Sequence, residues 1–571
     1  MISVWIYALP QGINEHIRKS GIPKRDISIY IKEVGTGGKV VASLNAEKSR
    51  TPASVIKVLS TYAAVLKLGF NYRWPTKFYT TGTLKKDVLH GDLYVKGFGD
   101  PTLSDNDLGK IVSYIRAEGI KKITGNIIID RTYFQVGNKN TSGFDNHTYS
   151  AYNAMPDAMM FNERVSTVCV TPKKRDVHKE SVDHSYKVVN NLKYVNKSCR
   201  GKYSWPRVKI DQSQAIPTVI LKGKISKRCG KRDICYVLTK PYKSFYYALK
   251  EKLRDEGVKV GGTLSLKKVP KNATELFTYY SQSLEKIISK TAKKSNNLYA
   301  RHLLLLLGAK RYGAPATVQN GRKAVERILR AKHALGRGTL KIDNGSGLSR
   351  TAKMTAKMLA TMYDSAYTRY GQRWMNTLSV AGVDGTIKKR FRGTSVRNRA
   401  WMKTGTLRRT KNIGGYVKNK AGKLYTVVIL VTTTKGKWKA AKLQNDIMQW
   451  LVNTSAKPSK KSTYKAKKKV TPKVSSKIKP KPKVKTKSKK RVYSEPTSYT
   501  QERFYVQAGS FATQPKKAYL LGIERLGLRY KVKYAQKYKV LIGPYSKEND
   551  ARKVLKKVRA NVSKGAFLTQ M

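Results

Sequence analysis

Acidic residues are scarce in this chain. Its 571 residues include 34 Asp and Glu against 117 Lys and Arg, which gives a formal net charge of +83. Such a charge is typical of nucleic-acid-binding proteins. Here, however, the basic residues are spread through every segment and no nucleic-acid-binding motif accompanies them. We therefore expect no nucleic acid as the main partner, and attribute the charge to a basic proteome or to an anionic extracellular polymer as partner.

The chain also lacks a long apolar run. No stretch reaches the ~18 apolar residues of a membrane-spanning helix, so we expect no transmembrane span. Residues 1–8 are apolar but short, and no basic segment precedes them. They have two interpretations, a plain first strand or the end of a signal peptide whose start was misassigned, and we favour the signal peptide.

Cysteine and histidine are few, with 4 and 7 residues respectively. There is no C-x-x-C, no H-E-x-x-H and no His at zinc spacing from the cysteines, so we expect neither a metal nor another cofactor. In an oxidising compartment Cys229 and Cys235 could close a short loop, and Cys199 is close enough in sequence to compete. Free thiols, including Cys169, are the other option, and the sequence does not choose.

The length is sufficient for three or four domains. Residues 86–280 are expected to be rich in short strands, with helices over 108–118 and 244–256 and a flexible or protruding segment at 173–203. The segment 456–499 is rich in Lys, Pro and Ser and is expected to be an extended, disordered linker. The expected division is 1–8 (signal-peptide remnant), 9–85 plus 281–455 (one discontinuous domain), 86–280 (inserted β-rich domains), 456–499 (linker) and 500–571 (a strand–helix–strand–strand–helix–strand domain).

Ser54 and Lys57 form a candidate acyl-transfer pair. Pro52 favours a helix start, and apolar residues at a 3–4 spacing follow, so we predict a buried helix. Residues three apart on a helix share a face, so the two side chains can touch. A lysine whose pKa is lowered by burial can accept the proton of a serine hydroxyl.

The S-x-x-K spacing is weak evidence alone, because a Lys-rich chain produces it by chance. Only Ser54 has a turn before it and a buried helix after it. The other matches are Ser265/Lys268, Ser283/Lys286, Ser462/Lys465 and Ser476/Lys479.

Two further motifs support Ser54. Lys403-Thr404-Gly405 is the only K-T-G in the chain and is predicted to lie on a strand, with Thr406 after it. An S-x-N motif should complete the site, and we choose Ser295/Asn297, which precedes a predicted helix in the same half of the chain as Lys403. Ser43/Asn45 and Ser104/Asn106 have the same spacing, but the first precedes Ser54 and the second lies in the β-rich insert.

With these motifs the chain resembles the D-alanyl-D-alanine carboxypeptidase/endopeptidase family, the low-molecular-mass class C penicillin-binding proteins. The likeness covers about 25–450 and includes signatures at 91–97, 99–103, 343–350 and 381–386. It implies an α/β (α+β) fold, the serine β-lactamase/DD-peptidase-like transpeptidase domain, with inserted β-rich domains. It also implies peptidoglycan stem peptides as substrates and β-lactam antibiotics as covalent inhibitors.

The resemblance further implies residue roles. Ser54 would be the nucleophile and Lys57 the proton acceptor, while Ser295 and Lys403 would carry the proton to the leaving amine. The remaining residues are expected to bind substrate: Asn297 an amide; Thr404, Gly405 and Thr406 the terminal carboxylate and oxyanion; and Leu348, Arg350, Tyr149 and Asp145 the stem-peptide side chain.

Two alternatives stay open. A serine β-lactamase shares all three motifs but needs an extra residue to hold a hydrolytic water, and the sequence identifies none. A catalytically idle wall-binding scaffold would keep the fold, but the intact motifs disfavour it.

Residues 503–511 and 538–545, followed by a basic helix from Ala551, resemble a SPOR domain, a βαββαβ module that binds glycan strands stripped of stem peptides. The resemblance implies a glycan-binding face with Gln507, Ser510, Phe511 and Tyr545. It also implies a periplasmic, cell-wall-associated protein, with the division septum as the expected place of action.

Overall fold

The computed structural model describes residues 9–454, except Thr36 and Arg337, and residues 504–570, except 512, 514, 516, 525, 527, 529, 536, 546, 547 and 564. The chain divides into two compact units, with the division between Lys461 and Ser462. The expected signal-peptide remnant (1–8) and the expected linker (456–499) lie outside the described residues.

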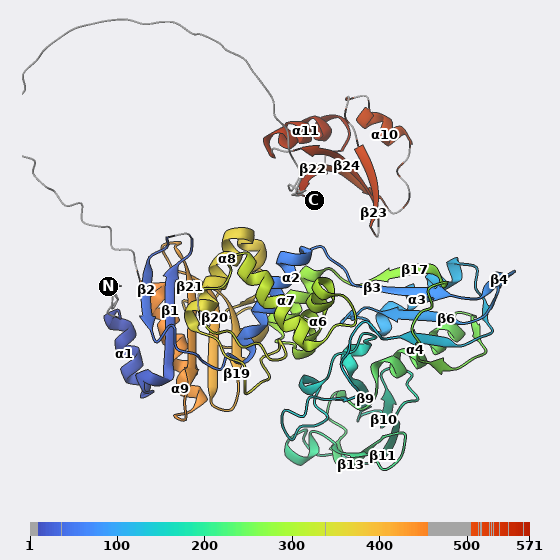
Figure 1. Ribbon diagram of the computed structural model, residues 1–571, viewed down its shortest axis with the longest axis horizontal. Coiled ribbons are helices and arrows are strands. Elements are labelled where there is room, and N and C mark those ends of the chain that lie inside the picture. Colours follow the sequence, from blue (N-terminus) through green and yellow to red (C-terminus); the bar gives the residue numbers. More distant parts are fainter. Residues whose placement is uncertain are drawn as a thin grey trace, which may run out of the picture. The chain divides into compact units, whose positions relative to one another are not determined.

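The first unit contains a six-stranded antiparallel sheet (Figure 1). The strand 424–432 in its interior is a run of β-branched and aliphatic residues, which favour strand conformation. In sheet order the strands are β18 (Ser379–Val380), β19 (Ala400–Thr406), β20 (Thr410–Lys418), β21 (Leu424–Thr432), β1 (Ile27–Glu33) and β2 (Val40–Leu44).

Helices cover both faces of this sheet. Successive side chains of a strand point to opposite faces: Val427, Ile429 and Val431 pack with α1 and α9, while Val428 and Leu430 pack with the helices of the other face. Because β21 is apolar on both faces, it lies in the interior of the unit. The helices are α1 (Gln11–Ser20), α9 (Lys437–Asn453), α2 (Lys57–Leu68), α5 (Leu284–Lys293), α6 (Asn297–Tyr312), α7 (Val318–Ala331) and α8 (Ala356–Met375).

A first inserted module follows α2 in the chain. Its two sheets pack with α3 (Asp105–Ala117) and α4 (Pro241–Asp255) around a core of their own. The strands are β16 (Leu264–Ser265), β8 (Ile127–Asp130), β6 (Leu93–Gly97), β3 (Pro75–Thr80) and β17 (Thr274–Tyr280) in one sheet, and β15 (Lys259–Val260), β7 (Lys122–Ile123), β5 (Val88–His90) and β4 (Thr83–Lys85) in the other.

A second inserted module has two three-stranded sheets around a smaller core. Segment 173–203, expected to be flexible or protruding, contains regular strand, because β11 pairs with β13 along its whole length despite its polar sequence. The strands are β10 (Asp176–Lys179), β9 (Ser166–Thr171) and β14 (Arg232–Tyr236), and β11 (Lys187–Val195), β13 (Thr218–Ser226) and β12 (Arg207–Asp211).

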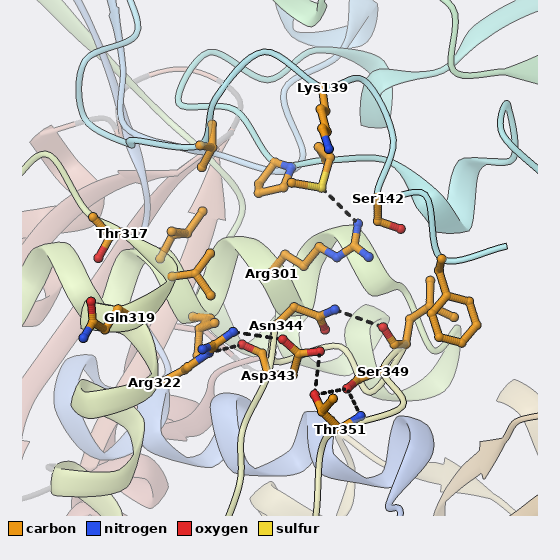
Figure 2. A pocket seen from close by; sticks show the side chains of 18 of the residues that line it. Lys139, Ser142, Arg301, Thr317, Gln319, Arg322, Asp343, Asn344, Ser349 and Thr351 are labelled. Carbon is orange, nitrogen blue, oxygen red and sulfur yellow. Dashed lines mark hydrogen bonds and ion pairs between the residues drawn. The ribbon is translucent and has the colours of Figure 1, made fainter.

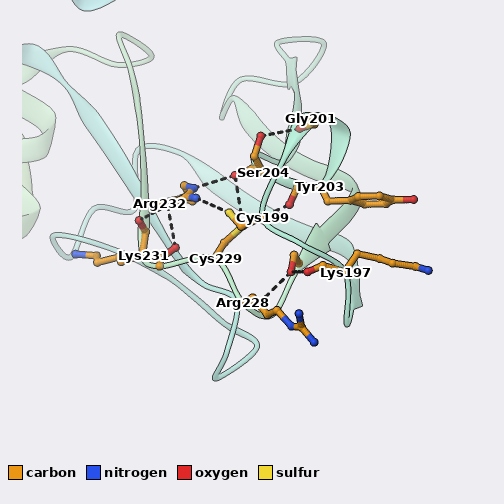
Figure 3. The surroundings of a disulfide bond; sticks show 11 residues. Lys197, Cys199, Gly201, Tyr203, Ser204, Arg228, Cys229, Lys231 and Arg232 are labelled. Carbon is orange, nitrogen blue, oxygen red and sulfur yellow. Dashed lines mark hydrogen bonds between the residues drawn. A yellow bond between two sulfur atoms is a disulfide. The ribbon is translucent and has the colours of Figure 1, made fainter.

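The cysteine pairing, which the sequence left open, is resolved in this module. Cys199 and Cys229 form a disulfide (Figure 3), whereas Cys169 and Cys235 are free. Cys229 therefore pairs with the competing cysteine rather than with Cys235, which lies on β14. The disulfide closes a loop with a sequence separation of 30 residues.

The second unit has the strand–helix order that the sequence predicted. Its sheet order is β23-β24-β22-β25, with antiparallel neighbours. Apolar side chains between the sheet and the helices form its core. The elements are β22 (Phe504–Phe511), α10 (Lys517–Glu524), β23 (Tyr530–Ala535), β24 (Lys537–Tyr545), α11 (Glu548–Asn561) and β25 (Phe567–Gln570). Among the described residues of the whole chain, no helix has the length and apolar character needed to cross a membrane.

Candidate active site

Ser54 lies in a short 3-10 turn, η2 (Ala53–Ile56), and α2 begins only at Lys57. The sequence predicted a turn that becomes a helix at this point. In a 3-10 turn, residues three apart lie nearly above one another, which brings Ser54 to Lys57. Ala53 has a positive φ of 48°, an unfavourable conformation for a residue with a Cβ. The turn is held from outside, because Asn412 Nδ2 donates to the carbonyl oxygens of Thr51 and Pro52 at 2.9 Å each.

Lys57 is fully buried at the start of α2. Its Nζ lies 2.7 Å from Ser54 Oγ and 2.7 Å from Asn297 Oδ1, and it also contacts the carbonyl oxygen of Ser346. Burial lowers the pKa of Lys57 well below its ordinary value, and the positive charges of Lys403 and Arg301 lower it further. Among the described residues, no carboxylate is a hydrogen-bond partner of Nζ, so the neutral amine is favoured.

Ser295 and Lys403 meet on the other side of the site. Ser295 lies between α5 and α6 with a φ of 57°, and Lys403 comes from β19. Lys403 Nζ donates to Ser295 Oγ at 2.9 Å and to the Thr404 carbonyl oxygen at 2.8 Å. Burial lowers the pKa of Lys403 to about 7. Each lysine of the site therefore contacts one serine hydroxyl, Ser54 for Lys57 and Ser295 for Lys403.

The end of β19 lies against the turn that carries Ser54. A Cβ at Gly405 would lie 2.8 Å from the Pro52 carbonyl oxygen and 2.9 Å from the Ser54 amide nitrogen, closer than a side chain tolerates. Thr404 Oγ1 lies 2.8 Å from Thr386 Oγ1, and Thr406 Oγ1 accepts a hydrogen bond from Lys411 at 3.2 Å. The strand thus brings backbone and hydroxyl groups beside the nucleophile.

Comparison with known proteins places this geometry in a family. Residues 9–454 match the D-Ala-D-Ala carboxypeptidase 3 (S13) family, and residues 500–570 match the SPOR domain. The chain belongs to the D-Ala-D-Ala carboxypeptidase 3 (S13) family. The resemblance drawn from the motifs is confirmed, and the protein is a serine-type D-Ala-D-Ala carboxypeptidase with a SPOR domain.

Named relatives agree with this assignment. The chain is 26% identical to the D-alanyl-D-alanine carboxypeptidase DacB of Haemophilus influenzae, over 67% of this chain and 81% of the relative. It is 27% identical to a D-alanyl-D-alanine carboxypeptidase of an Actinomadura species, over 69% of this chain and 76% of the relative. Penicillin-binding protein 4 of H. influenzae has the same fold, with a TM-score of 0.65 at 21% identity over 77% of this chain and 99% of that chain. The expected fold class is therefore confirmed.

The alternative S-x-N and S-x-x-K matches have structural roles or lie outside the described residues. Ser104 is the N-cap of α3 in a capping box with Asp107, which explains its spacing without catalysis. Asn45 donates its amide to the carbonyl oxygens of Lys24 and Ile27. Ser283 is the N-cap of α5. Ser462/Lys465 and Ser476/Lys479 lie outside the described residues.

The residues expected around the stem-peptide side chain fall into two groups. Leu348 and Arg350 line a cavity of about 660 Å³ (Figure 2), where the Arg350 guanidinium lies 4.5 Å from the centre of the Phe144 ring. Tyr149 and Asp145 do not line it. Tyr149 packs edge-on against Tyr236.

Asp145 instead stabilises the loop that touches Asn297. Its carboxylate accepts hydrogen bonds from Tyr152 and Asn153, both at 2.9 Å. The carbonyl oxygen of Tyr152 accepts a hydrogen bond from Asn297 Nδ2, also at 2.9 Å. Asp145 therefore contacts the same loop, 151–154, that accepts the hydrogen bond from Asn297.

Several contacts of the site were missed by sequence reasoning. Glu163, from the insert, accepts hydrogen bonds from Lys290 at 2.6 Å, Tyr299 at 2.9 Å and Asn296 at 2.8 Å. Asn296 is the middle residue of the S-x-N motif and the N-cap of α6. No local pattern marks Glu163, which lies more than 130 positions from Asn296 in the chain. Ser346 and Gly347 lie in the signature 343–350, which the resemblance identified. The sequence analysis assigned no role to either residue.

The SPOR residues lie on two strands of the second unit. Ser510 is exposed and Gln507 is buried on β22. Phe511 packs edge-on against Tyr519 at 4.8 Å between ring centres. Tyr545, at the end of β24, packs against the core and is partly buried.

Proposed function

We propose that Ser54 forms an acyl-enzyme with stem peptides that end in D-Ala-D-Ala. The observation that carries this proposal is the 2.7 Å separation between Ser54 Oγ and Nζ of the fully buried Lys57. A neutral amine has two N–H groups and one lone pair. Asn297 Oδ1 and the Ser346 carbonyl oxygen are placed to accept the two N–H groups. The lone pair is then available to accept the Ser54 hydroxyl proton.

In the first half of the reaction, Ser54 Oγ attacks the carbonyl carbon of the penultimate D-Ala and its proton passes to Lys57. The backbone N–H groups of Ser54 and Thr406 would stabilise the oxyanion. Lys403 and Ser295 would carry a proton to the nitrogen of the terminal D-Ala, which leaves as the C–N bond breaks. Thr404 and Thr406 would bind its carboxylate, and Asn297 a substrate amide.

In the second half, water attacks the ester carbonyl and restores the Ser54 hydroxyl. If the leaving amine belongs to the side chain of a neighbouring stem peptide, the same steps cut a cross-link. We therefore propose endopeptidase activity beside carboxypeptidase activity. Product analysis of muropeptides treated with the pure enzyme tests it, and cross-linked dimers that persist while pentapeptides are trimmed would contradict the endopeptidase part.

Mass spectrometry of the penicillin-treated protein tests the nucleophile. We expect one penicilloyl adduct on a peptide that contains Ser54, and none on Ser54→Ala. An equal adduct on Ser54→Ala would refute the assignment. Rapid turnover of penicillin without a lasting adduct would instead favour the serine β-lactamase alternative. A folded protein that neither acylates nor cleaves would be the catalytically idle scaffold.

We further propose that residues 500–571 bind denuded glycan strands through Gln507, Ser510, Phe511 and Tyr545, and that the protein acts in the periplasm at the wall, with the septum as the favoured place. The Cys199–Cys229 disulfide supports an oxidising compartment. The proposed division is a peptidase domain (9–85 plus 281–455), inserted domains (86–280), a linker (456–499) and the glycan-binding domain.

A further inference from the structure

One sheet of the second inserted module has a face that packs on the module core and a face that is exposed to solvent. Its strands β11 and β13 run parallel along their whole length (Figure 1), and β12 is antiparallel to β13. The side chains that pack in the core are Val188, Leu192, Tyr194, Val208, Ile210, Val219, Leu221 and Ile225. Because successive side chains of a strand point to opposite faces, the residues between these form the outer face.

The outer face of this sheet is strongly basic. Its exposed cations are Lys187 and Lys193 of β11, Arg207 and Lys209 of β12, and Lys222 and Lys224 of β13. Asp211, at the end of β12, is the single acid at the outward positions of these three strands. Among the described residues of the chain, no acid forms an ion pair with any of the six cations. The face therefore has a large uncompensated positive charge.

The register of the strands places like charges directly opposite each other. Arg207 of β12 pairs with Lys222 of β13, and Lys193 of β11 pairs with Lys224 of β13. Like charges in directly opposite positions destabilise a sheet. Parallel strands are also usually covered on both faces, whereas β11 and β13 are covered on one. The needs of folding do not explain this arrangement, and an anion bound across the strands would offset the repulsion.

The spacing of the cations fits an extended polymer better than a single small anion. Neighbouring strands lie about 4.8 Å apart, and alternate residues of one strand lie about 6.6 Å apart. The six charges are thus spread over a surface and do not converge on one point. No aromatic residue occupies an outward position of these strands, so the face lacks the stacking platform that proteins use for single-stranded nucleic acid.

We propose that the outer face of the β11-β13-β12 sheet binds intact peptidoglycan through the carboxylates of its stem peptides. The inference rests on the proposed function, because the ligand is the polymer on which the same chain acts. It adds a wall contact in the first unit to the one proposed for residues 500–571. The two contacts differ in chemistry, since the second unit is proposed to bind strands that lack stem peptides.

Sedimentation with purified sacculi measures this contact. Every chain is full length and carries Ser54→Ala, so that binding is measured without cleavage. The test variant also carries Lys193→Gln, Arg207→Gln, Lys222→Gln and Lys224→Gln. At about 0.1 M salt we expect the Kd for sacculi to rise at least ~5-fold in the test variant, because each exposed ion pair contributes little and four are lost together.

The matched control removes the same charge from the first inserted module. Its substitutions are Lys85→Gln, Lys86→Gln, Lys267→Gln and Lys268→Gln, at exposed lysines that have no ion-pair partner among the described residues. The control should bind sacculi within ~2-fold of the reference chain, which carries Ser54→Ala alone. Equal weakening in the control and in the test variant would show that only net charge matters, and would overturn the proposal.

A second variant keeps the charge and changes the side chains, with Lys193→Arg, Lys222→Arg and Lys224→Arg. It should bind like the reference chain. The Tm of the glutamine variant should not fall, because the substitutions remove repulsion between opposite strands. A glutamine variant with an unchanged Tm and an unchanged Kd for sacculi would also overturn the proposal.

Sacculi whose carboxylates have been converted to methylamides identify the group that is bound. We expect the difference between the reference chain and the glutamine variant to disappear on these sacculi. If the difference persists, stem-peptide carboxylates are not the ligand and the proposal is wrong. If the substitutions weaken binding to single-stranded DNA but not to sacculi, the face belongs to a nucleic-acid site and the proposal is wrong as well.

The penicillin experiment is independent of this one, because it needs Ser54 and no wall polymer. If the sheet does not bind sacculi but Ser54 still acquires the penicilloyl adduct, this inference fails and the proposed function stands. If the adduct is missing while the glutamine variant binds sacculi less tightly, the proposed function fails and the wall contact stands.

Discussion

Two buried lysines decide how the site behaves with pH. Lys57 and Lys403 are both fully buried, and burial is the first cause of the lowered pKa of each. A lysine near the surface would stay protonated at neutral pH and could not accept a proton. The buried position of the pair is thus a requirement of the proposed chemistry.

Replacement of Lys57 by a permanently charged residue tests its role. Lys57→Arg is expected to lower the rate of Ser54 acylation by a fluorescent penicillin ~10²-fold or more, because arginine does not lose its proton. In the wild type the rate should fall as pH is lowered, since protonated Lys57 has no lone pair. Lys67→Arg, on the exposed side of the same helix, is the control. A Lys57→Arg enzyme that acylates within tenfold of the wild type would contradict the assignment.

Lys403 makes folding stability depend on pH. Its pKa is about 7 when folded, against an ordinary value of 10.5. Between these two values unfolding takes up a proton, so stability rises with pH across that window and the group adds no slope below it. Lys403→Met should therefore reduce the slope of the unfolding free energy in this window by up to ~1.4 kcal/mol per pH unit.

Urea unfolding followed by tryptophan fluorescence measures this slope. All seven tryptophans precede residue 455, so the signal excludes the SPOR unit. Equal slopes for wild type and Lys403→Met between pH 7.5 and 9.5 (roughly the centre of the window) would show that Lys403 is protonated in the folded protein.

At the scale of elements, the nucleophile turn depends on close backbone contacts. Gly347 has a φ of 75°, and a Cβ there would lie 2.0 Å from the Ala53 carbonyl oxygen. Gly347→Ala is expected to slow acylation at least ~10-fold and to destabilise the protein by more than ~1 kcal/mol, because both strain and a clash arise.

Gly109→Ala is the control for this change. Gly109 is exposed on α3, and the nearest atom to a Cβ added there would be Lys252 Cε at 3.8 Å, an ordinary van der Waals contact. The substitution should stabilise the protein by up to ~1 kcal/mol and leave acylation unchanged. If Gly347→Ala and Gly109→Ala had equal effects on stability and on the acylation rate, the turn that carries Ser54 would tolerate displacement.

Glu163 links the inserted module to the S-x-N motif. We expect Glu163→Ala to lower kcat about 10-fold with little change in KM, since Asn296 loses its partner and the adjacent Ser295 is displaced. Glu163→Gln keeps hydrogen-bonding capacity and should restore most of kcat. Glu326→Ala, which removes a surface pair with Arg330 on α7, is the control. Failure of the Gln variant to restore kcat would indicate that the charge, rather than position, matters.

The sequence predicted elements that have a local signal. The 3–4 spacing after Pro52 predicted α2, and the strand predicted at Lys403-Thr404-Gly405 is β19. Contacts between distant residues had no such signal. Asn412 is 360 positions from Pro52, and nothing in its neighbourhood marks it as a support of the nucleophile turn.

Charge was also hard to interpret from the sequence. In a chain with 117 basic residues, no single arginine is conspicuous, so Arg301 could not be distinguished from its neighbours. It is distinguished only in the folded protein, where its Nε and Nη2 have no hydrogen-bond partner among the described residues and the described lining of the neighbouring cavity is basic. The cysteine pairing was undetermined for a similar reason, because three candidates lie within 37 positions of one another.

At the scale of the molecule, catalysis and wall binding should be separable. A chain that ends at residue 499 is expected to acylate with penicillin at the wild-type rate, because the residues of the proposed site all belong to the first unit. Its retention on purified sacculi should fall several-fold. The assay belongs at about 0.3 M salt, where attraction between the basic linker and the anionic wall is screened. Equal retention of both chains would contradict a glycan-binding role for residues 500–571.

The pairing of β1 with β21 has a consequence for synthesis. Ile27 pairs with Val431 and Glu33 with Tyr425. The first strand of the sheet in the chain therefore cannot form these pairs until the last strand is present. The inserted modules have cores of their own and can fold before β21 is available. A nascent chain released before residue 432 would lack the strand between β1 and β20. Nearly the whole peptidase domain must therefore be present before the sheet is complete and the site can react with a stem peptide or a penicillin.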